Sequence, residues 1–150
     1  MITNYFVQHG VAESKDVDQS RPLSDDGKYL VAKVASRLKD QNIVIGKIHH
    51  SGKLRALQTA QIFSEILEVS AISEMSGLNP NDEARKIIDQ LKEDAVMYVG
   101  HLPNIQKIVS GIITRGGSDP VVKFQNSAVA CIEIDQGQGC LKWFITADFC

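Results

Sequence analysis

The stretch Ile2-Thr3-Asn4-Tyr5-Phe6-Val7-Gln8-His9-Gly10 begins as an apolar run and stops abruptly at its last three residues. A buried strand over residues 2–7 would deliver the ring of His9 to the carboxyl edge of a sheet. In α/β proteins ligands bind at that edge, because loops and helix amino ends converge there. His9 is therefore the first candidate for chemistry, although a single histidine after a strand is also an ordinary loop residue.

The same pattern recurs further along the chain. An apolar run over residues 43–48 leads into His49-His50-Ser51-Gly52, and a run over residues 95–99 ends in Gly100-His101. Residues 127–134 and 141–145 then form two strand runs joined by a glycine-bearing hairpin connection. With helices between the first strands, this order predicts a three-layer α/β/α fold, with a mostly parallel sheet and an antiparallel hairpin at one edge.

Apolar spacing places the helices. We expect one over residues 25–39, with Ser24 as its N-cap, and others starting near residue 53, from residue 81 or 82 to 91, and after Pro103. Residues 11–20 read as a loop over the carboxyl edge, and residues 69–80 as a connecting loop with room for a short extended piece. Arg55 falls in the first turn of the second helix, where a cation opposes the helix dipole and hints at a nearby anion.

Composition narrows the function classes. The 150 residues fit one domain, 1–150, with 43% hydrophobic and 23% charged residues. A net charge of -2 argues against non-specific binding to nucleic acid or to a membrane surface. Three widely spaced cysteines, with no apolar run long enough to span a membrane, indicate a cytoplasmic protein with reduced thiols.

Three strand ends bring their polar residues to one edge. His9, Arg55 and His101 can meet there, and Arg21 can join them from the loop. Two histidines and two arginines do not suit a metal, because the arginines would repel the cation. They suit a phosphate, whose oxygens match guanidinium groups, while an imidazole can donate to an oxygen or attack phosphorus.

These residues lie in stretches that resemble the histidine phosphatase superfamily, whose fold is that of phosphoglycerate mutase, and in particular its small SixA-type phosphohistidine phosphatase branch. The similar stretches run nearly end to end in family order: Tyr5-Phe6-Val7-Gln8-His9-Gly10, Arg21-Pro22-Leu23-Ser24, Ser51-Gly52-Lys53-Leu54-Arg55-Ala56-Leu57-Gln58-Thr59-Ala60, Leu78-Asn79-Pro80, Val99-Gly100-His101-Leu102-Pro103 and Phe124-Gln125-Asn126-Ser127-Ala128.

The resemblance implies roles for these residues. His9 would be the nucleophile and carry the phosphoryl group transiently, while Arg55 and His101 would bind its oxygens. Arg21, found in the SixA-like branch, would add to the pocket. The resemblance also implies a mechanism without metal or organic cofactor, and phosphate or tungstate as inhibitors. The loop carbonyls after His9 are expected to hold its other ring nitrogen as a donor.

Two positions depart from the family pattern. The first motif arginine is Gln8 here, which keeps a hydrogen-bond donor but loses a charge; this costs about 1–3 kcal/mol of transition-state stabilisation unless Arg21 or Lys53 compensates. Gly77 stands where many relatives carry a glutamate that protonates the leaving group, and Glu74 or Glu13 can substitute. Both departures favour a good leaving group such as an imidazole.

Other polar residues are assigned simpler roles. His49 and His50 are interpreted as strand-end residues, Lys53 as a solvated first-turn lysine and Trp143 as edge-strand packing, whereas Asn104 and Ser127 are possible pocket residues.

The leading hypothesis is a phosphatase that acts on a phosphohistidine of a signalling protein, because no long insertion is present that would cap the site. The alternative is a phosphate- or phosphoprotein-binding member that has lost useful catalysis through Gln8 and Gly77. A mutase or small-metabolite phosphatase is disfavoured by the short chain.

Overall fold

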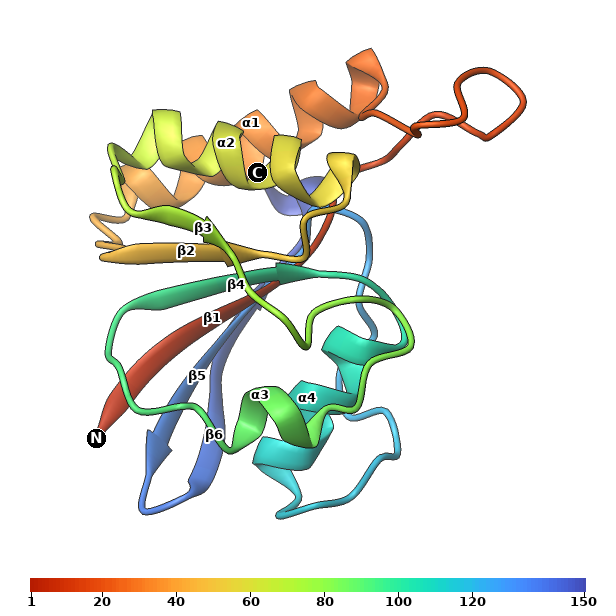
Figure 1. The fold of residues 1–150 in the computed structure, drawn as a ribbon. Helices are drawn as coiled ribbons and strands as arrows, with labels where there is room; N and C mark the ends of the chain where they lie inside the picture. The colour runs from red at the N-terminus through yellow and green to blue at the C-terminus, as the bar shows by residue number, and fades with distance from the viewer.

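A six-stranded sheet in the order β3-β2-β4-β1-β5-β6 forms the centre of the molecule (Figure 1). The computed structural model describes residues 1–150. Strands β3, β2, β4 and β1 are parallel, and β5 and β6 add an antiparallel hairpin at one edge. The strands are β1 Ile2–Gln8, β2 Lys47–His50, β3 Ile72–Glu74, β4 Val96–Gly100, β5 Val129–Asp135 and β6 Gln138–Ile145.

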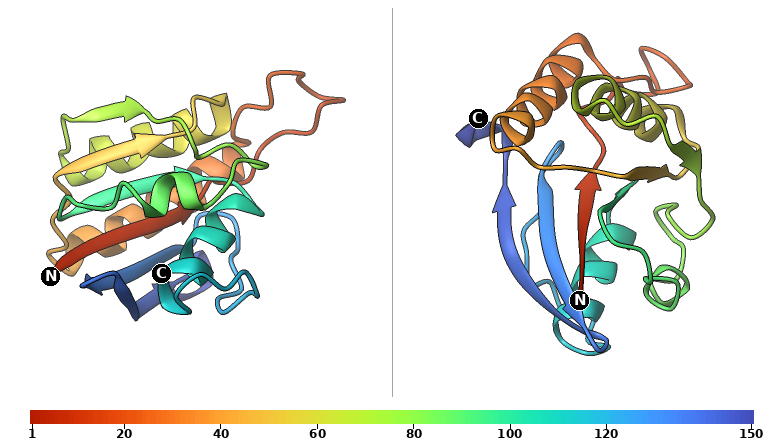
Figure 2. Two further views of the ribbon diagram at one scale, coloured as in Figure 1. Left: turned by 60° about the horizontal axis from the view of Figure 1, so that its bottom comes forward. Right: turned by 90° about the vertical axis from the view of Figure 1, so that its left-hand side faces the viewer.

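Helices cover both faces of this sheet, so the predicted three-layer α/β/α fold is confirmed (Figures 1 and 2). Helices α1 (Asp25–Asp40) and α2 (Leu54–Leu67) lie on one face, and α3 (Arg85–Ile88) and α4 (Asn104–Ile113) lie on the other. A short 3-10 helix, η1 (Ala147–Phe149), follows β6. None of the helices is both long and apolar enough to cross a membrane.

Strand β1 occupies a central position because its side chains are apolar on both faces. Tyr5 and Val7 pack into the core beneath α1 and α2, whereas Phe6 packs into the core beneath α3 and α4. The strand pairs with β4 in parallel, and its last pair joins Gln8 to Gly100. Two buried faces and two pairing partners fix where β1 ends, and hence where His9 lies.

Helix α1 begins and ends close to the predicted residues. Ser24 Oγ accepts a hydrogen bond from Gly27 N at 2.9 Å, and Asp25 and Asp26 in the first turn complement the helix dipole. Helices α2 and α4 also confirm their predictions, with Lys53 and Pro103 as their N-cap residues.

Two predicted elements differ from the structure. Residues 43–46 are not strand: Val44 is 76% exposed, and the chain joins the sheet only from Lys47 onward, next to β4. The helix expected up to residue 91 is a single turn, because Asn79 N donates to Asp82 Oδ2 in a turn and regular helix begins only at Arg85. Ile43 and Ile45 of the first segment, and Ile87 of the second, still reach the core, as their apolar character predicts.

Two features complete the carboxyl edge of the sheet. The connection over residues 69–80 contains β3, which pairs in parallel with β2 and is the outermost strand on the side opposite the β5–β6 hairpin. The loop over residues 11–20 projects from the molecule beyond the carboxyl end of β1, as both figures show (Figures 1 and 2).

Candidate active site

His9 follows β1 directly, and backbone contacts hold it in place. His9 N donates to Gly100 O at 3.0 Å, and Asn126 Nδ2 donates to His9 O at 3.0 Å. The ring Nδ1 lies 2.7 Å from Gly10 O. Because a carbonyl oxygen only accepts, Nδ1 carries the hydrogen, and Nε2 is left with its lone pair. The predicted loop carbonyl is therefore the one of Gly10.

His101 faces His9 from the end of β4. The two ring centroids are 4.9 Å apart, and His101 is almost completely buried. His101 Nε2 lies 2.6 Å from Ser51 Oγ, whereas its Nδ1 is buried without a hydrogen-bond partner in the protein. One ring nitrogen is thus engaged and the other is free to meet a ligand.

Burial keeps both imidazoles neutral. It is the main cause that lowers the pKa of His9 to about 4, with the positive charges of Arg55 and Arg21 acting in the same direction against the Gly10 hydrogen bond. Burial also lowers the pKa of His101 to about 3, helped first by the charge of His9 and then by that of Arg55. Near neutral pH, His9 therefore presents an unprotonated Nε2.

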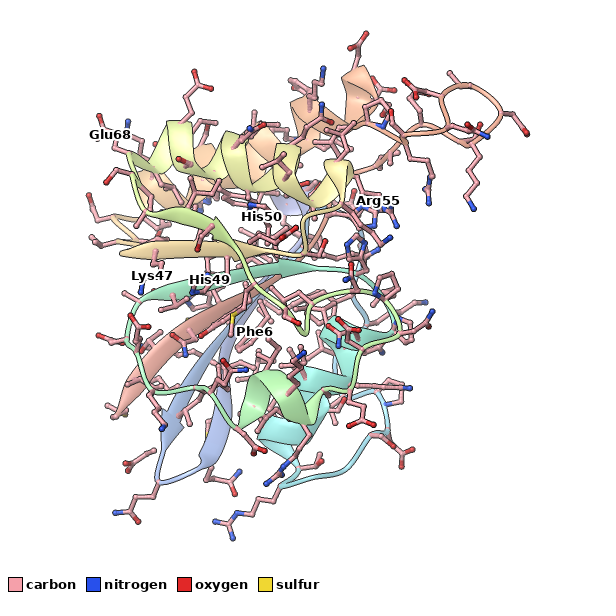
Figure 3. The ribbon with its side chains drawn as sticks, in the orientation of Figure 1. Phe6, Lys47, His49, His50, Arg55 and Glu68 are labelled. Carbon is pink, nitrogen blue, oxygen red and sulfur yellow. The ribbon has the colours of Figure 1, made fainter.

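Arg55 is tied to the His9 loop through Thr59. Thr59 Oγ1 donates to Arg55 O at 2.7 Å and accepts from Gly10 N at 2.9 Å. The first turn of α2 and the end of β1 are thereby held together. Arg55 Nε is buried without a partner in the protein, and burial lowers the pKa of the guanidinium. Figure 3 shows Arg55 among several nitrogen-bearing side chains at the carboxyl edge of the sheet.

Arg21 joins this group from the loop, as expected from the sequence. Its backbone is left-handed, with φ 50°, and its Nε donates to Glu13 O at 3.0 Å. The charge of Arg21 acts on the pKa of His9, His101 and Arg55. We call His9, His101, Arg55 and Arg21 the histidine pocket; the structure brings all four together.

Gln8 is buried beside this pocket. Its backbone bonds to the segment before β5, where Ser127 N donates to Gln8 O at 3.0 Å. The side-chain Oε1 of Gln8 and the Oγ of Ser127 are both buried without a partner in the protein. Asn104 Nδ2 donates to Gly77 O and Asp82 O, so it braces the loop after β3.

A basic cavity of about 380 Å³ opens next to the histidine pocket. Its charged lining residues are all cations, and none of them forms an ion pair with a carboxylate. The basic cavity is lined by Lys15, Gln19, Ser20, Arg21, Lys53, Leu54 and Arg55.

The two candidate proton donors lie in different places. Glu74, the last residue of β3, lies against Gly52, where its carboxylate fills the space that a Cβ would need. Glu13 contributes its backbone carbonyl to Arg21. Gly77 has φ +107°, and a Cβ there would lie 3.0 Å from Ile87 Cδ1, so a side chain at this position would be strained.

Three polar residues that support the pocket were not assigned a role from sequence: Ser51, Thr59 and Asn126. All three lie inside the stretches that resemble the superfamily, so the sequence signal was present, but only the coordinates pair them with His101, Gly10 and His9. No cluster of three or more His, Cys, Asp or Glu side chains is arranged to hold a metal ion.

No family profile matches the chain. The chain is 26% identical over 148 residues to phosphohistidine phosphatase SixA of Escherichia coli (strain K12), covering 93% of this chain and 90% of that protein.

Solved structures share the fold. The protein histidine phosphatase SixA complexed with tungstate has a TM-score of 0.88 at 23% identity, covering 99% of each chain. A phosphoserine phosphatase from Entamoeba histolytica, in complex with 3-phosphoglyceric acid, has a TM-score of 0.74 at 16% identity, covering 97% of this chain and 98% of that one. The chain is thus a homologue of SixA with the fold of the histidine phosphatase superfamily.

Proposed function

We propose that this protein is a phosphohistidine phosphatase, which removes a phosphoryl group from a protein histidine through a phospho-His9 intermediate. The observation that carries the proposal is the pair of buried, neutral imidazoles, His9 and His101, whose rings lie 4.9 Å apart beside two arginines. A neutral Nε2 is required for nucleophilic attack, and the cations match the charge on the phosphoryl oxygens.

The reaction has two displacement steps. In the first, the Nε2 lone pair of His9 forms a bond to phosphorus, and the substrate's P–N bond breaks with its electron pair going to the leaving imidazole. In the second, water attacks phosphorus, and the His9–P bond breaks to release inorganic phosphate and neutral His9. Gly10 O holds the Nδ1 hydrogen of His9 throughout, so Nε2 is aimed the same way in both steps.

Arg55 and His101 would bind the phosphoryl oxygens. Ser51 Oγ accepts a hydrogen bond from Lys53 N at 3.3 Å, so its own hydroxyl hydrogen is available to His101 Nε2 at 2.6 Å. In that arrangement the His101 hydrogen lies on Nδ1, the nitrogen that has no partner in the protein. A neutral His101 would then donate to an equatorial oxygen as charge develops there.

The leaving group decides how much a proton donor matters. A leaving imidazole that carries a hydrogen on its other nitrogen departs without needing a strong acid, whereas an alkoxide does need one. Gly77 supplies no acid, and Glu74 lies against Gly52 at the border of the site. We therefore favour phosphohistidine over alkyl phosphates, with Glu74 ahead of Glu13 as the candidate proton donor.

Turnover of a phosphohistidine peptide tests the proposal. We expect the wild-type protein to release phosphate from it, tungstate to inhibit competitively, and His9→Ala to be inactive. A Lys39→Gln variant, changed at an exposed lysine in the last turn of α1, serves as the control. Wild-type turnover by His9→Ala would contradict the assignment.

A second candidate function rests on Gln8. A buried neutral amide replaces the charge of the family's motif arginine, and its Oε1 has no partner in the protein. The site would then hold phosphate or a phosphoprotein without turning it over. Binding of tungstate by the wild-type protein, with no release of phosphate from any phosphohistidine substrate, would select this function.

A further inference from the structure

The basic cavity extends beyond the histidine pocket. Two of its cations, Arg21 and Arg55, also belong to the pocket, whereas Lys15 and Lys53 do not. The charge of Lys53 still acts on the pKa of His101, but that of Lys15 acts on neither histidine. Lys15 belongs to the projecting loop and Lys53 is the N-cap residue of α2, so the two lysines line the cavity from different segments; we call them the outer lysines.

No acidic side chain lines this cavity or forms an ion pair with one of its cations. The three ion pairs of the molecule involve other residues, and no Asp or Glu lines the cavity. The projecting loop does carry Glu13, Asp16 and Asp18, but Asp18 Oδ1 is bound by Ser20 N at 2.9 Å and by Ser20 Oγ at 2.6 Å. A chain with 18 acidic and 16 basic side chains thus leaves four cations together without a carboxylate.

Like charges gathered in this way repel one another unless an anion binds among them. One phosphoryl group at His9 would be met by Arg55, Arg21 and His101. The outer lysines would remain uncompensated. A cavity of about 380 Å³ also extends along two walls, the projecting loop and the first turn of α2, and so offers room for more of the substrate than one phosphoryl group.

We propose that Lys15 and Lys53 bind a second anionic group of the substrate. Its most direct source is a carboxylate of an Asp or Glu that flanks the phosphohistidine; a second phosphate on a small phosphate compound has the same chemistry. This inference rests on the proposed function, because it takes the first group to be the phosphoryl group at His9. Under this proposal the enzyme selects its substrate by the negative charge beside the phosphohistidine as well as by the phosphohistidine itself.

Two phosphohistidine peptides test the inference. They have the same sequence, except that one carries Asp and Glu beside the phosphohistidine and the other carries Asn and Gln. We expect the wild-type protein to have a kcat/KM about tenfold higher for the acidic peptide, since two charge-assisted contacts are at stake. In the double variant Lys15→Gln/Lys53→Gln this ratio should fall to about two or less. Raising the salt concentration should also lower the ratio of the two kcat/KM values for the wild-type protein, because salt screens the charges.

Lys39→Gln is the matched control, because Lys39 is an exposed lysine in the last turn of α1, at the end away from the carboxyl edge. It should keep the wild-type ratio. Pyrophosphate and inorganic phosphate, compared as competitive inhibitors, form a second arm. Tighter binding of pyrophosphate that depends on the two lysines, without a preference between the peptides, would identify the second phosphate as the source.

Equal kcat/KM for both peptides, together with equal inhibition by phosphate and pyrophosphate, would overturn the inference. A ratio that survives in the double variant would also overturn it. If neither peptide is hydrolysed at all, the proposed function fails instead. Direct binding of pyrophosphate and phosphate by calorimetry, with wild-type and double-variant protein, then still decides whether the cavity binds a second anionic group.

Discussion

The amino ends and the carboxyl ends of the strands form two edges of the sheet, and charged side chains are paired at the first but not at the second. At the amino edge, Lys47 Nζ lies 2.7 Å from Glu93 Oε2, and Asp94 Oδ1 accepts from Thr3 N at 2.7 Å. At the carboxyl edge the four cations of the basic cavity have no carboxylate partner. Lys47 and Arg55 stand at opposite ends of the sheet (Figure 3). A cation that is paired with a carboxylate of the protein contributes to its structure, whereas the unpaired cations of the basic cavity are complementary to a bound anion.

Two histidines of the sheet, His49 and His101, differ in the same way. His49, on β2, lies 3.0 Å by its Nδ1 from Ser73 Oγ and packs against Tyr98, so it is used by the sheet itself. His101 also binds a serine, but its other ring nitrogen is buried without a partner in the protein. A histidine–serine contact is common to both, and only the unpartnered nitrogen distinguishes the site.

The largest contrast between the edges should come from removing one cation from each. Arg55→Ala is expected to lower kcat/KM for a phosphohistidine peptide about 10²–10³-fold, because a charge aimed at the phosphoryl oxygens is lost. Lys47→Ala removes a partly exposed ion pair and should leave the kinetics unchanged, with a loss of about 1 kcal/mol or less in the free energy of unfolding. Steady-state kinetics and urea unfolding check both. Equal kinetic losses in the two variants would remove the distinction between the edges.

Gln8→Arg sharpens the contrast by adding a cation to the carboxyl edge. We expect a gain of about tenfold or more in rate, since a charge-assisted hydrogen bond replaces a neutral one at the phosphoryl group. The free protein should lose stability, because the new charge joins existing ones. A rate assay beside thermal unfolding measures both. An unchanged or lower rate would indicate that the pocket is adapted to the neutral amide.

Ser51→Ala compares the two histidine–serine pairs. We expect a loss of about tenfold in kcat, because without the serine hydroxyl the His101 hydrogen is no longer held on Nδ1. Nitrogen NMR should report this as a change in the tautomer of His101. Ser73→Ala, beside His49, is the matched control and should change neither rate nor His101 spectrum. A slow Ser51→Ala with an unchanged His101 tautomer would show a merely structural role for Ser51.

Stability at acid pH tests the burial of the two histidines. The folded pKa of His9 (about 4) and of His101 (about 3) lies below the ordinary value of 6.5, so the unfolded chain binds more protons in between. Their contribution to stability is complete above about pH 6.5 and declines as the pH falls toward 4. His49 and His50 act in the same direction. Between pH 7 and pH 4.5, urea unfolding should show a smaller loss in the free energy of unfolding for His9→Gln than for the wild type. An equal or larger loss for the variant would contradict burial of a neutral His9.

Sequence patterns predicted the parts that depend on periodicity. Strand β1, helix α1 and the β5–β6 hairpin follow from apolar spacing, and the meeting of His9 with His101 follows because parallel strands end at one edge. The start of β2 at Lys47 was missed, since residues 43–45 are apolar enough to be strand, but only Ile43 and Ile45 reach the core, and they do so before the chain pairs with β4. Apolar spacing also overestimated the length of α3, because part of the predicted helix forms turns that place apolar residues in a similar way.

Contacts between residues distant in sequence lay beyond such patterns. The sequence does not show that Ser51 Oγ forms a hydrogen bond with Nε2 of His101, which lies 50 residues further along the chain. It also does not show that Thr59 links Gly10 to Arg55. The left-handed backbone of Arg21, which turns its side chain toward Glu13 O, is equally invisible without the fold. The sequence predicted the histidines and arginines of the pocket, and the structure adds the neutral hydroxyl and amide side chains that position them.

Trapping the phosphoenzyme tests the central claim most directly. The protein is mixed with a phosphohistidine peptide, quenched rapidly in alkali, digested and analysed by mass spectrometry, with His101→Ala and His9→Ala proteins in parallel. We predict an acid-labile, alkali-stable phosphoryl group on His9, absent from His9→Ala, which forms and decays at rates that account for turnover. Turnover without any label on His9, or a label on a different residue that persists in His9→Ala, would contradict His9 as the nucleophile.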